Sequence, residues 1–420
     1  MSKYQRFKQT EIGRIPREWE VVRLGDEKVA EIGGNKSISR SNEVAFIPME
    51  AIPDSGIFVN FEIRSMKEVK SFTYCESGDL LLAKITPSLE NGKQGIVPDT
   101  VPNGFALATT EVFPIKCKGI EKLFLFYVLK DSRFRNKIIA SMIGTTGRQR
   151  ATKVNVKNLL IPFPPLPEQK KIAEILSTVD EAIEKVGSAI AKTERLKKGL
   201  MRELLTKGIG HKEFKDTEIG RIPKEWEVVK LRDVINLCQY GLSVKVKEEG
   251  RYPIIKMDDI VNGYVIDGNI KYADIDEETF ENFKLNKGDI LFNRTNSYEL
   301  VGRTGIFLLE GSYVFASYLI RLKPKHEIVN SRFLSFYLVF KNDKIRHLAT
   351  RAVHQANINA TNLQKFKLPL PPLPEQQKIA EILSTIDKRL ELLKVKKERL
   401  ERVKKGLMND LLTGRRRVKT

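Results

Sequence analysis

Apolar side chains recur at alternating steps of three and four residues along two long stretches of the chain. The first stretch follows the prolines of Phe163–Pro167 and ends near Thr206–Gly208, where a glycine favours a helix stop. A seam sustained over about four heptads predicts two helices of about 38 residues each. The first seam comprises Ile172, Ile175, Val179, Ala182, Val186, Ala189, Thr193, Leu196 and Leu200. The second comprises Ile379, Ile382, Ile386, Leu390, Leu393, Leu400, Val403 and Leu407, with Lys396 interrupting it.

Helices of this length bury a full apolar stripe only against another long helix. We therefore predict that the two helices pair in antiparallel fashion, with one domain at each end of the pair. Two alternatives remain open at this stage. Each helix packs on its own domain, or the helices pair between two chains.

The chain is an internal duplication with an offset of 207 residues. The segment from Thr10 to Asp26 matches the segment from Thr217 to Asp233 at 14 of 17 positions. The segments that begin at Pro164 and Pro371 match at 15 of 17 positions. Three long matches in one register, the last at Arg195 and Arg402, show that one unit occurs twice.

Between the matched segments the two copies share a pattern but few identities. Residues 78–84 resemble residues 288–294 at an offset of 210, which predicts a common framework of buried strands. The differences fit either neutral drift in loops or recognition of two different targets. Trp19 and Trp226, one in each copy, precede a strand-like Val-Val-x-Leu segment, and we predict that both lie in the core.

Composition narrows the class of partner. The formal net charge is +20 and 41% of the residues are hydrophobic, so we expect packed cores and a polyanionic partner, with nucleic acid first. No apolar run approaches the roughly 20 residues of a membrane span, and the N-terminus is polar. The three cysteines are far apart, which argues against a disulfide framework. We expect a cytoplasmic protein.

No catalytic or metal-binding pattern stands out. The sequence has no phosphate-binding Gly-x-x-x-x-Gly-Lys loop and no Gly-x-Gly-x-x-Gly motif. A nuclease-like set can be assembled from Asp54, Glu68 and Lys70, but such a triplet arises easily when 30% of the residues are charged. The four histidines lack metal-ligand spacing. We predict no catalytic and no metal-binding residue.

Two polar loops in each copy suit DNA recognition, because base edges are bound by Arg, Asn, Gln, Ser and Thr side chains. One loop lies just before the proline-rich segment, and the other follows a buried strand. The candidates in the first copy are Lys84, Lys93, Gln94, Thr145, Thr146, Arg148, Gln149, Arg150 and Lys153. The candidates in the second copy are Arg294, Asn296, Arg303, Arg351, His354, Gln355 and Asn357.

The repeated segments resemble the specificity subunit of type I restriction–modification enzymes. The resemblance rests on Ile-Gly-x-Ile-Pro-x-x-Trp and on Pro-Pro-Leu-Pro-Glu-Gln-x-Lys-Ile-Ala, each present twice, and on the ending Leu411–Gly414. It implies an α+β fold, with two pseudo-symmetric α/β target-recognition domains separated by two long antiparallel helices. The expected boundaries are 1–160 and 208–367 for the domains, 161–207 for the first helix and 368–420 for the second helix with its basic tail. A family Gly-Thr-Thr loop matches Gly144–Thr146, whereas the second copy departs from it at Arg351.

The resemblance also implies a function and a set of partners. Each domain would recognise one half of a bipartite, asymmetric site in double-stranded DNA, and the helices would set the spacer. Two modification (methyltransferase) subunits would dock on the helices, and restriction subunits would complete the nuclease. This chain would bind no cofactor, while S-adenosylmethionine, ATP and Mg²⁺ would serve the partner subunits. Two alternatives are an autonomous nuclease or methyltransferase with an unrecognised active site and a non-specific basic architectural protein.

Overall fold

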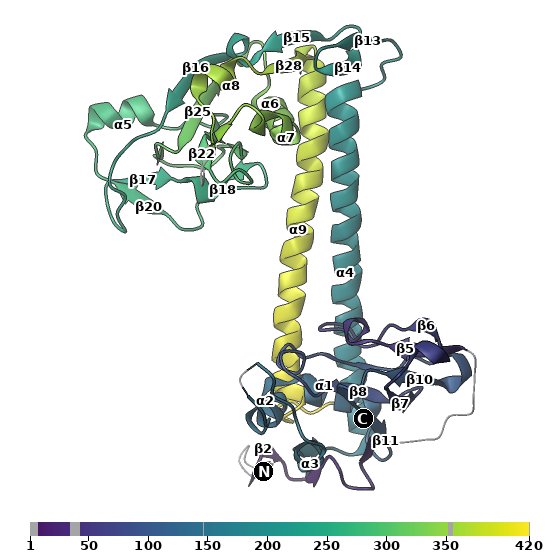
Figure 1. Ribbon diagram of the computed structural model, residues 1–420. Coiled ribbons are helices and arrows are strands. Elements are labelled where there is room, and N and C mark those ends of the chain that lie inside the picture. Colours follow the sequence, from purple (N-terminus) through teal and green to yellow (C-terminus); the bar gives the residue numbers. More distant parts are fainter. Residues whose placement is uncertain (1–6, 34–42, 146, 352–355, 420) are drawn as a thin grey trace. The chain divides into compact units, whose positions relative to one another are not determined.

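The computed structural model describes residues 7–33, 43–145, 147–351 and 356–419. They form two compact units, which we call unit 1 (residues 1–189 with 393–420) and unit 2 (residues 190–392). Helix α4 (Leu166–Lys207) begins in unit 1 and ends in unit 2, and helix α9 (Leu373–Leu411) runs from unit 2 into unit 1. Each unit therefore holds one mixed α/β domain and one end of each long helix (Figure 1).

Unit 1 is built on two four-stranded sheets with the strand orders β6-β5-β10-β7 and β4-β11-β8-β9. Unit 1 also has two antiparallel two-stranded sheets, the hairpin of β1 with β2 and the pairing of β3 with β12 from the far end of the domain sequence. The strands are β1 (Phe7–Thr10), β2 (Gly13–Pro16), β3 (Glu20–Arg23), β4 (Ala30–Ile32), β5 (Glu43–Ile47), β6 (Glu62–Ser65), β7 (Thr73–Glu76), β8 (Leu80–Ala83), β9 (Gln94–Ile96), β10 (Phe105–Ala108), β11 (Val112–Cys117) and β12 (Leu160–Phe163). The short helices are α1 (Lys122–Lys130), α2 (Ser132–Ala140) and α3 (Lys153–Lys157).

Unit 2 repeats this plan with the strand orders β16-β25-β21-β23-β19-β18 and β20-β17-β24. Its additional sheet, β22-β27-β26, has only short strands. The strands are β13 (Phe214–Thr217), β14 (Gly220–Pro223), β15 (Glu227–Lys230), β16 (Ile235–Tyr240), β17 (Tyr252–Ile255), β18 (Ile260–Val261), β19 (Tyr264–Val265), β20 (Lys271–Ala273), β21 (Ile290–Asn293), β22 (Thr295–Asn296), β23 (Thr304–Ile306), β24 (Val314–Phe315), β25 (Leu319–Pro324), β26 (Thr350–Arg351), β27 (Ala356–Asn357) and β28 (Lys367–Leu370). The short helices are α5 (Glu277–Phe283), α6 (Ser331–Phe340), α7 (Asn342–Arg346) and α8 (Ala360–Gln364).

The repeated Pro-Glu-Gln motif anchors the start of each long helix. In unit 1 the buried Gln169 donates from Nε2 to the carbonyl of Pro164 (2.8 Å) and accepts the backbone N–H of Glu121 (2.8 Å). Glu121 is also the N-cap of α1, so one glutamine ties α4 to the start of α1. In unit 2 Gln376 makes the same two bonds, to Pro371 (2.8 Å) and from Asn330 (2.9 Å), and Asn330 caps α6.

Each tryptophan is fully buried and donates its indole N–H to the glutamate of this motif, as expected for core anchors. The Trp19 Nε1 to Glu168 Oε2 distance is 2.9 Å, and the Trp226 Nε1 to Glu375 Oε2 distance is also 2.9 Å. A basic residue just after a long helix completes each cluster. Arg417 binds both oxygens of Glu168 (2.6 and 3.0 Å). His211 lies 2.9 and 3.1 Å from the oxygens of Glu375.

Glycine is required where each long helix turns toward its tryptophan. Gly208 has a φ of +68° and Gly414 has a φ of +64°, a left-handed backbone that glycine adopts at low cost. A Cβ on Gly208 would lie 2.7 Å from Cζ2 of Trp226, and one on Gly414 would lie 3.2 Å from Cζ2 of Trp19. The Leu-Leu-Thr-x-Gly and Leu-Leu-Thr-Gly endings therefore close the two units in the same way.

Ion pairs fix the direction of the paired helices within each unit. In unit 1, Lys404 of α9 binds Asp180 of α4 at 2.6 Å, and Arg417 beyond the end of α9 binds Glu168 near the start of α4. In unit 2, Lys197 of α4 binds Asp387 of α9 at 2.5 Å. In unit 1 the later basic residue, Arg417, binds the earlier acidic residue, Glu168, and the earlier one, Lys404, binds the later one, Asp180. The two helices are therefore antiparallel, as predicted, and they pair within one chain.

The predicted seam is only partly correct. The first turns of each helix also pack on their own domain, since Ile172 and Leu176 belong to the core of unit 1. Val186 and Thr193 are buried as expected. Leu196 and Val403, which occupy equivalent positions in the two copies, were predicted to be buried but are 50% and 51% exposed. Two paired helices bury one narrow stripe, and these two side chains lie outside it.

Candidate nucleic-acid interface

The two polar loops of each copy, predicted separately from the sequence, meet at one place in each unit. In unit 1 Arg150 forms antiparallel bridges with Ile85 on one side and with Ile143 on the other. In unit 2 Asn357 of β27 pairs in the same way with Thr295 of β22 and Thr350 of β26. We call these three-segment arrangements the loop junctions of unit 1 and unit 2.

The loop junction of unit 1 presents an ordered guanidinium. Arg150 donates from Nε to Oε2 of Glu111 (3.1 Å) and from Nη2 to Oε1 (3.0 Å). The hydrogen bond and charge of Glu111 raise the pKa of Arg150. The turn before it is tight, because Gly144 has a φ of +125° and a Cβ there would lie 2.7 Å from the carbonyl oxygen of Arg148. Thr145 and Arg148 are exposed on this turn.

The loop junction of unit 2 is neutral at its centre and flanked by an aromatic–cation pair. Thr295 donates from Oγ1 to Oδ1 of Asn357 at 3.1 Å. The guanidinium of Arg294 lies over the ring of Tyr240, 4.7 Å from its centroid. Tyr318, whose carbonyl accepts the backbone N–H of Arg294 (3.0 Å), is 49% exposed. This junction thus offers aromatic surface as well as hydrogen-bonding groups.

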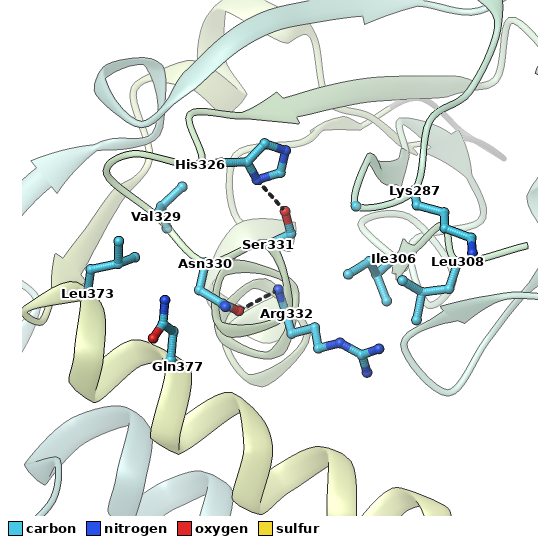
Figure 2. A pocket seen from close by; sticks show the side chains of 11 residues that line it. Lys287, Ile306, Leu308, His326, Val329, Asn330, Ser331, Arg332, Leu373 and Gln377 are labelled. Carbon is cyan, nitrogen blue, oxygen red and sulfur yellow. Dashed lines mark hydrogen bonds between the residues drawn. The ribbon is translucent and has the colours of Figure 1, made fainter.

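A shallow cavity of about 350 Å³ in unit 2 lacks the features of a catalytic site. Figure 2 shows His326, Ser331 and Arg332 around the start of α6. Asn330 Oδ1 already accepts the N–H groups of Arg332 (3.0 Å) and Phe333 (3.1 Å), so the helix start is capped from within. The polar groups that the start of α6 contributes to the cavity wall are therefore engaged in capping this helix.

Where the structure describes the chain, its titratable side chains give no sign of a nucleophile or metal centre. Among the described residues no group of three His, Cys, Asp or Glu side chains could hold a metal ion. Burial raises the pKa of Cys75 and of Cys117 to about 12, and that of Cys238 to about 11, which disfavours the reactive thiolate. Asp54, from the nuclease-like triplet, lies 3.7 Å from Lys93. Over the same described residues, no helix is long and apolar enough to cross a membrane.

Comparison with known proteins decides the family. A sequence profile described as "Type I restriction modification DNA specificity domain" matches residues 16–191 and again residues 223–402. The chain belongs to this specificity family. The type I restriction enzyme MjaVIII specificity subunit of Methanocaldococcus jannaschii is 32% identical over 434 residues, which cover 99% of this chain and 97% of the relative. The EcoKI specificity subunit of Escherichia coli K12 is 24% identical, covering 61% of this chain and 56% of that protein.

Solved structures agree on the fold. The S subunit of a type I restriction–modification system from M. genitalium has a TM-score of 0.59 at 16% identity and covers 94% of this chain and 96% of its own. A chain from a structure titled for complex assembly and conformational transition of the type I R-M system has a TM-score of 0.55 at 20% identity, covering 95% and 99%. The predicted family and α+β fold are confirmed. The prediction of a DNA-specificity subunit, rather than an autonomous nuclease or methyltransferase, agrees with the family.

Most of the predicted contact residues in this family member lie at or beside the loop junctions. Lys84 lies over the ring of Phe113 (5.3 Å), and its carbonyl accepts the N–H of Ala151 (2.7 Å). The carbonyl of Gln149 accepts the N–H of Thr86 (3.0 Å). Exposed side chains include Lys153, at the start of α3, and Arg303.

Five further candidates need separate description. Asn296 donates from Nδ2 to Sδ of Met257 (3.3 Å). Arg351 lies in β26, but only its backbone is described. Thr146, His354 and Gln355 lie outside the described residues.

Lys93 and Gln94 point into unit 1 and not toward its surface. The ammonium of Lys93 donates to the carbonyls of Met49 (3.2 Å) and Ile52 (2.7 Å). Gln94 is fully buried in β9 and donates from Nε2 to the carbonyl of Phe126 in α1 (2.7 Å). Both side chains hold the framework together, and we leave them out of the proposed interface.

Glu111, Tyr240 and Tyr318 were not predicted as contact residues from the sequence. Glu111 and Tyr318 occupy equivalent places, since their carbonyls accept the N–H of Lys84 and of Arg294, each at 3.0 Å. Glu111 immediately precedes the paired residues of β11, and Tyr318 immediately precedes those of β25. Matching these two strands at the offset of 207 residues would have placed Glu111 opposite Tyr318.

Proposed function

We propose that each unit of this specificity-family chain recognises one half of a bipartite, asymmetric site in double-stranded DNA through its loop junction. The observation that carries the proposal is the pair of junctions themselves. The backbone pairing is the same around Arg150 and around Asn357, while the side chains differ. Equal frames with unequal hydrogen-bonding groups suit two half-sites of different sequence. The net charge of +20 supplies attraction to phosphate.

The residues proposed to contact DNA are the described candidates on or beside the junctions, together with Thr146, His354 and Gln355, which lie outside the described residues. They are Lys84, Thr145, Thr146, Arg148, Gln149, Arg150, Lys153, Arg294, Asn296, Arg303, Arg351, His354, Gln355 and Asn357. We retain the boundaries 1–160 and 208–367 for the two recognition domains, with 161–207 and 368–420 as helical segments that set the spacer.

Two modification subunits dock on the long helices in this proposal, and restriction subunits complete the assembly in the cytoplasm. The exposed Leu196 and Val403 support such docking, because equivalent apolar side chains left on a charged helix surface suit a partner that binds each unit alike. The chain itself binds no cofactor; S-adenosylmethionine, ATP and Mg²⁺ act in the partner subunits.

Selection from a randomised duplex library tests the proposal. The purified full-length chain, with its modification subunits where they are required for stable binding, should enrich a motif of two defined segments separated by an undefined spacer. Inserting one heptad at equivalent places in α4 and α9 should change the spacer and leave both segments unchanged. Binding that falls steeply with salt but enriches no sequence would instead indicate a non-specific architectural protein.

A further inference from the structure

Arg150 and Asn357 occupy the same structural position in the two units. Each is the central residue of a loop junction, paired through its backbone on both sides. They are 207 residues apart, which is the offset of the duplication. A residue held on both sides by strand pairing has little backbone freedom, so its side chain leaves the surface in a fixed direction.

A second contact fixes the side chain of Arg150. Glu111 engages the guanidinium edge formed by Nε and Nη2. The edge formed by Nη1 and the second hydrogen of Nη2 points away from that carboxylate. The Arg150 side chain is 55% exposed, so this edge can reach a ligand. Two parallel N–H donors match the O6 and N7 acceptors of guanine in the major groove.

A second contact also fixes the side chain of Asn357. The hydroxyl of Thr295 donates to Oδ1, which orients the amide. Oδ1 keeps a second lone pair, and among the residues that the structure describes the Nδ2 group of Asn357 has no hydrogen-bond partner. One acceptor beside one donor, held in one plane, matches the N6 donor and N7 acceptor of adenine.

We propose that Arg150 and Asn357 are the matched base-recognition residues of the two units, Arg150 for a guanine and Asn357 for an adenine in the major groove. Glu111 and Thr295 act as positioning residues for them. The inference rests on the proposed function and adds to it the identity of one base in each half-site. The two units thus use one backbone frame with a different side chain at its centre, and each central side chain is held from a different position of that frame.

The test uses the full-length chain and the motif selected by the wild type. Arg150→Ala removes both donors of the guanidinium edge, so the motif should lose one guanine preference in one segment. Affinity for the selected site should fall by about 5- to 150-fold, the range for a bidentate base contact. The adenine preference of the other segment should persist, which shows that the variant is folded. Asn357→Ala should give the reciprocal result. Arg17→Ala, at an exposed arginine outside the long helices and the loop junctions, is the matched control and should leave the motif unchanged.

Base analogues make the test specific to N7. Replacing the guanine by 7-deazaguanine should weaken wild-type binding and should have little further effect on Arg150→Ala. Glu111→Gln should reduce the ratio of affinities for the guanine and 7-deazaguanine sites, while affinity for the analogue site stays the same. A guanine preference that survives in Arg150→Ala would overturn the inference and leave the proposed function standing. A wild-type chain that enriches no motif would overturn both.

Discussion

The buried cluster of Trp19, Glu168 and Arg417 predicts a measurable loss of stability on Glu168→Ala. Removal of the carboxylate leaves the indole N–H of the fully buried Trp19 without its acceptor. An unpaired buried donor costs about 1–3 kcal/mol. The side chain of Arg417 is 40% exposed and returns to water, so loss of that ion pair adds only about 0–1 kcal/mol. We expect unit 1 to lose about 2–3 kcal/mol of unfolding free energy.

The assay uses the fact that the chain has two tryptophans, one in each unit. In a Trp226→Phe background, the fluorescence of Trp19 reports the urea unfolding of unit 1. With a slope of about 2–3 kcal/mol per molar urea, the midpoint should fall by about 1 M. Glu18→Ala is the control, because Glu18 also binds Arg417 (2.6 Å) but its side chain is 69% exposed. Its midpoint should move by less than about 0.3 M. Equal midpoint shifts for the two variants would refute the argument that burial of the indole N–H sets the cost.

Further perturbations test other parts of unit 1. Desolvation, with repulsion from Arg135 and Lys404, lowers the pKa of Lys130 to about 8. Between pH 8 and 10.5 the folded state therefore holds fewer protons than the unfolded state, so the unfolding free energy should rise by about 2–3 kcal/mol over this range. Lys130→Met should abolish this rise. A Lys130→Met chain whose unfolding free energy rises as much as that of the wild type would contradict the assignment. Gly144→Ala strains a position at φ +125°, so it should weaken DNA binding about tenfold through a shift of the turn and lower the urea midpoint of unit 1 by about 0.3–1 M. Arg148→Ala should cost about 1–3 kcal/mol of binding and relax one half-site; equal weakening on all DNA would reassign Arg148 to phosphate contact.

The long helices could be predicted because their signal is local and repeated. An apolar seam, proline before the first turn and glycine after the last predict a helix from neighbouring residues alone. The helices span 42 and 39 residues, against about 38 expected from the pattern. The exposure of Leu196 and Val403 could not be predicted, because heptad spacing does not say how wide a stripe the partner helix covers.

The interface was predictable only in part, because its geometry depends on contacts between distant residues. The sequence identified both loops in each unit but not that Ile85 pairs with Arg150 across 65 residues. Gln94 was expected on the surface because it follows a polar, glycine-containing loop. Its amide instead reaches the carbonyl of Phe126 in the core, a partner 32 residues away that no local pattern indicates.

The way each domain binds the helix pair shows which features the duplication retains. Asp180 and Asp387 are equivalent, and each binds the equivalent lysine of the facing helix, Lys404 or Lys197. Each aspartate also accepts a tyrosine hydroxyl, at 2.8 Å in unit 1 and 2.9 Å in unit 2. Tyr127 of α1 supplies that hydroxyl in unit 1, whereas β19 supplies it in unit 2.

The tyrosine that corresponds to Tyr127 by the offset of 210 residues is Tyr337, which is buried in the core of unit 2. Tyr264 on β19 therefore replaces it at Asp387 from a different element. The hydrogen bond has been kept while the residue that makes it has changed. The two units thus share a hydrogen bond between the domain and the helix pair although different elements supply it, whereas at the loop junctions one shared backbone frame carries different side chains.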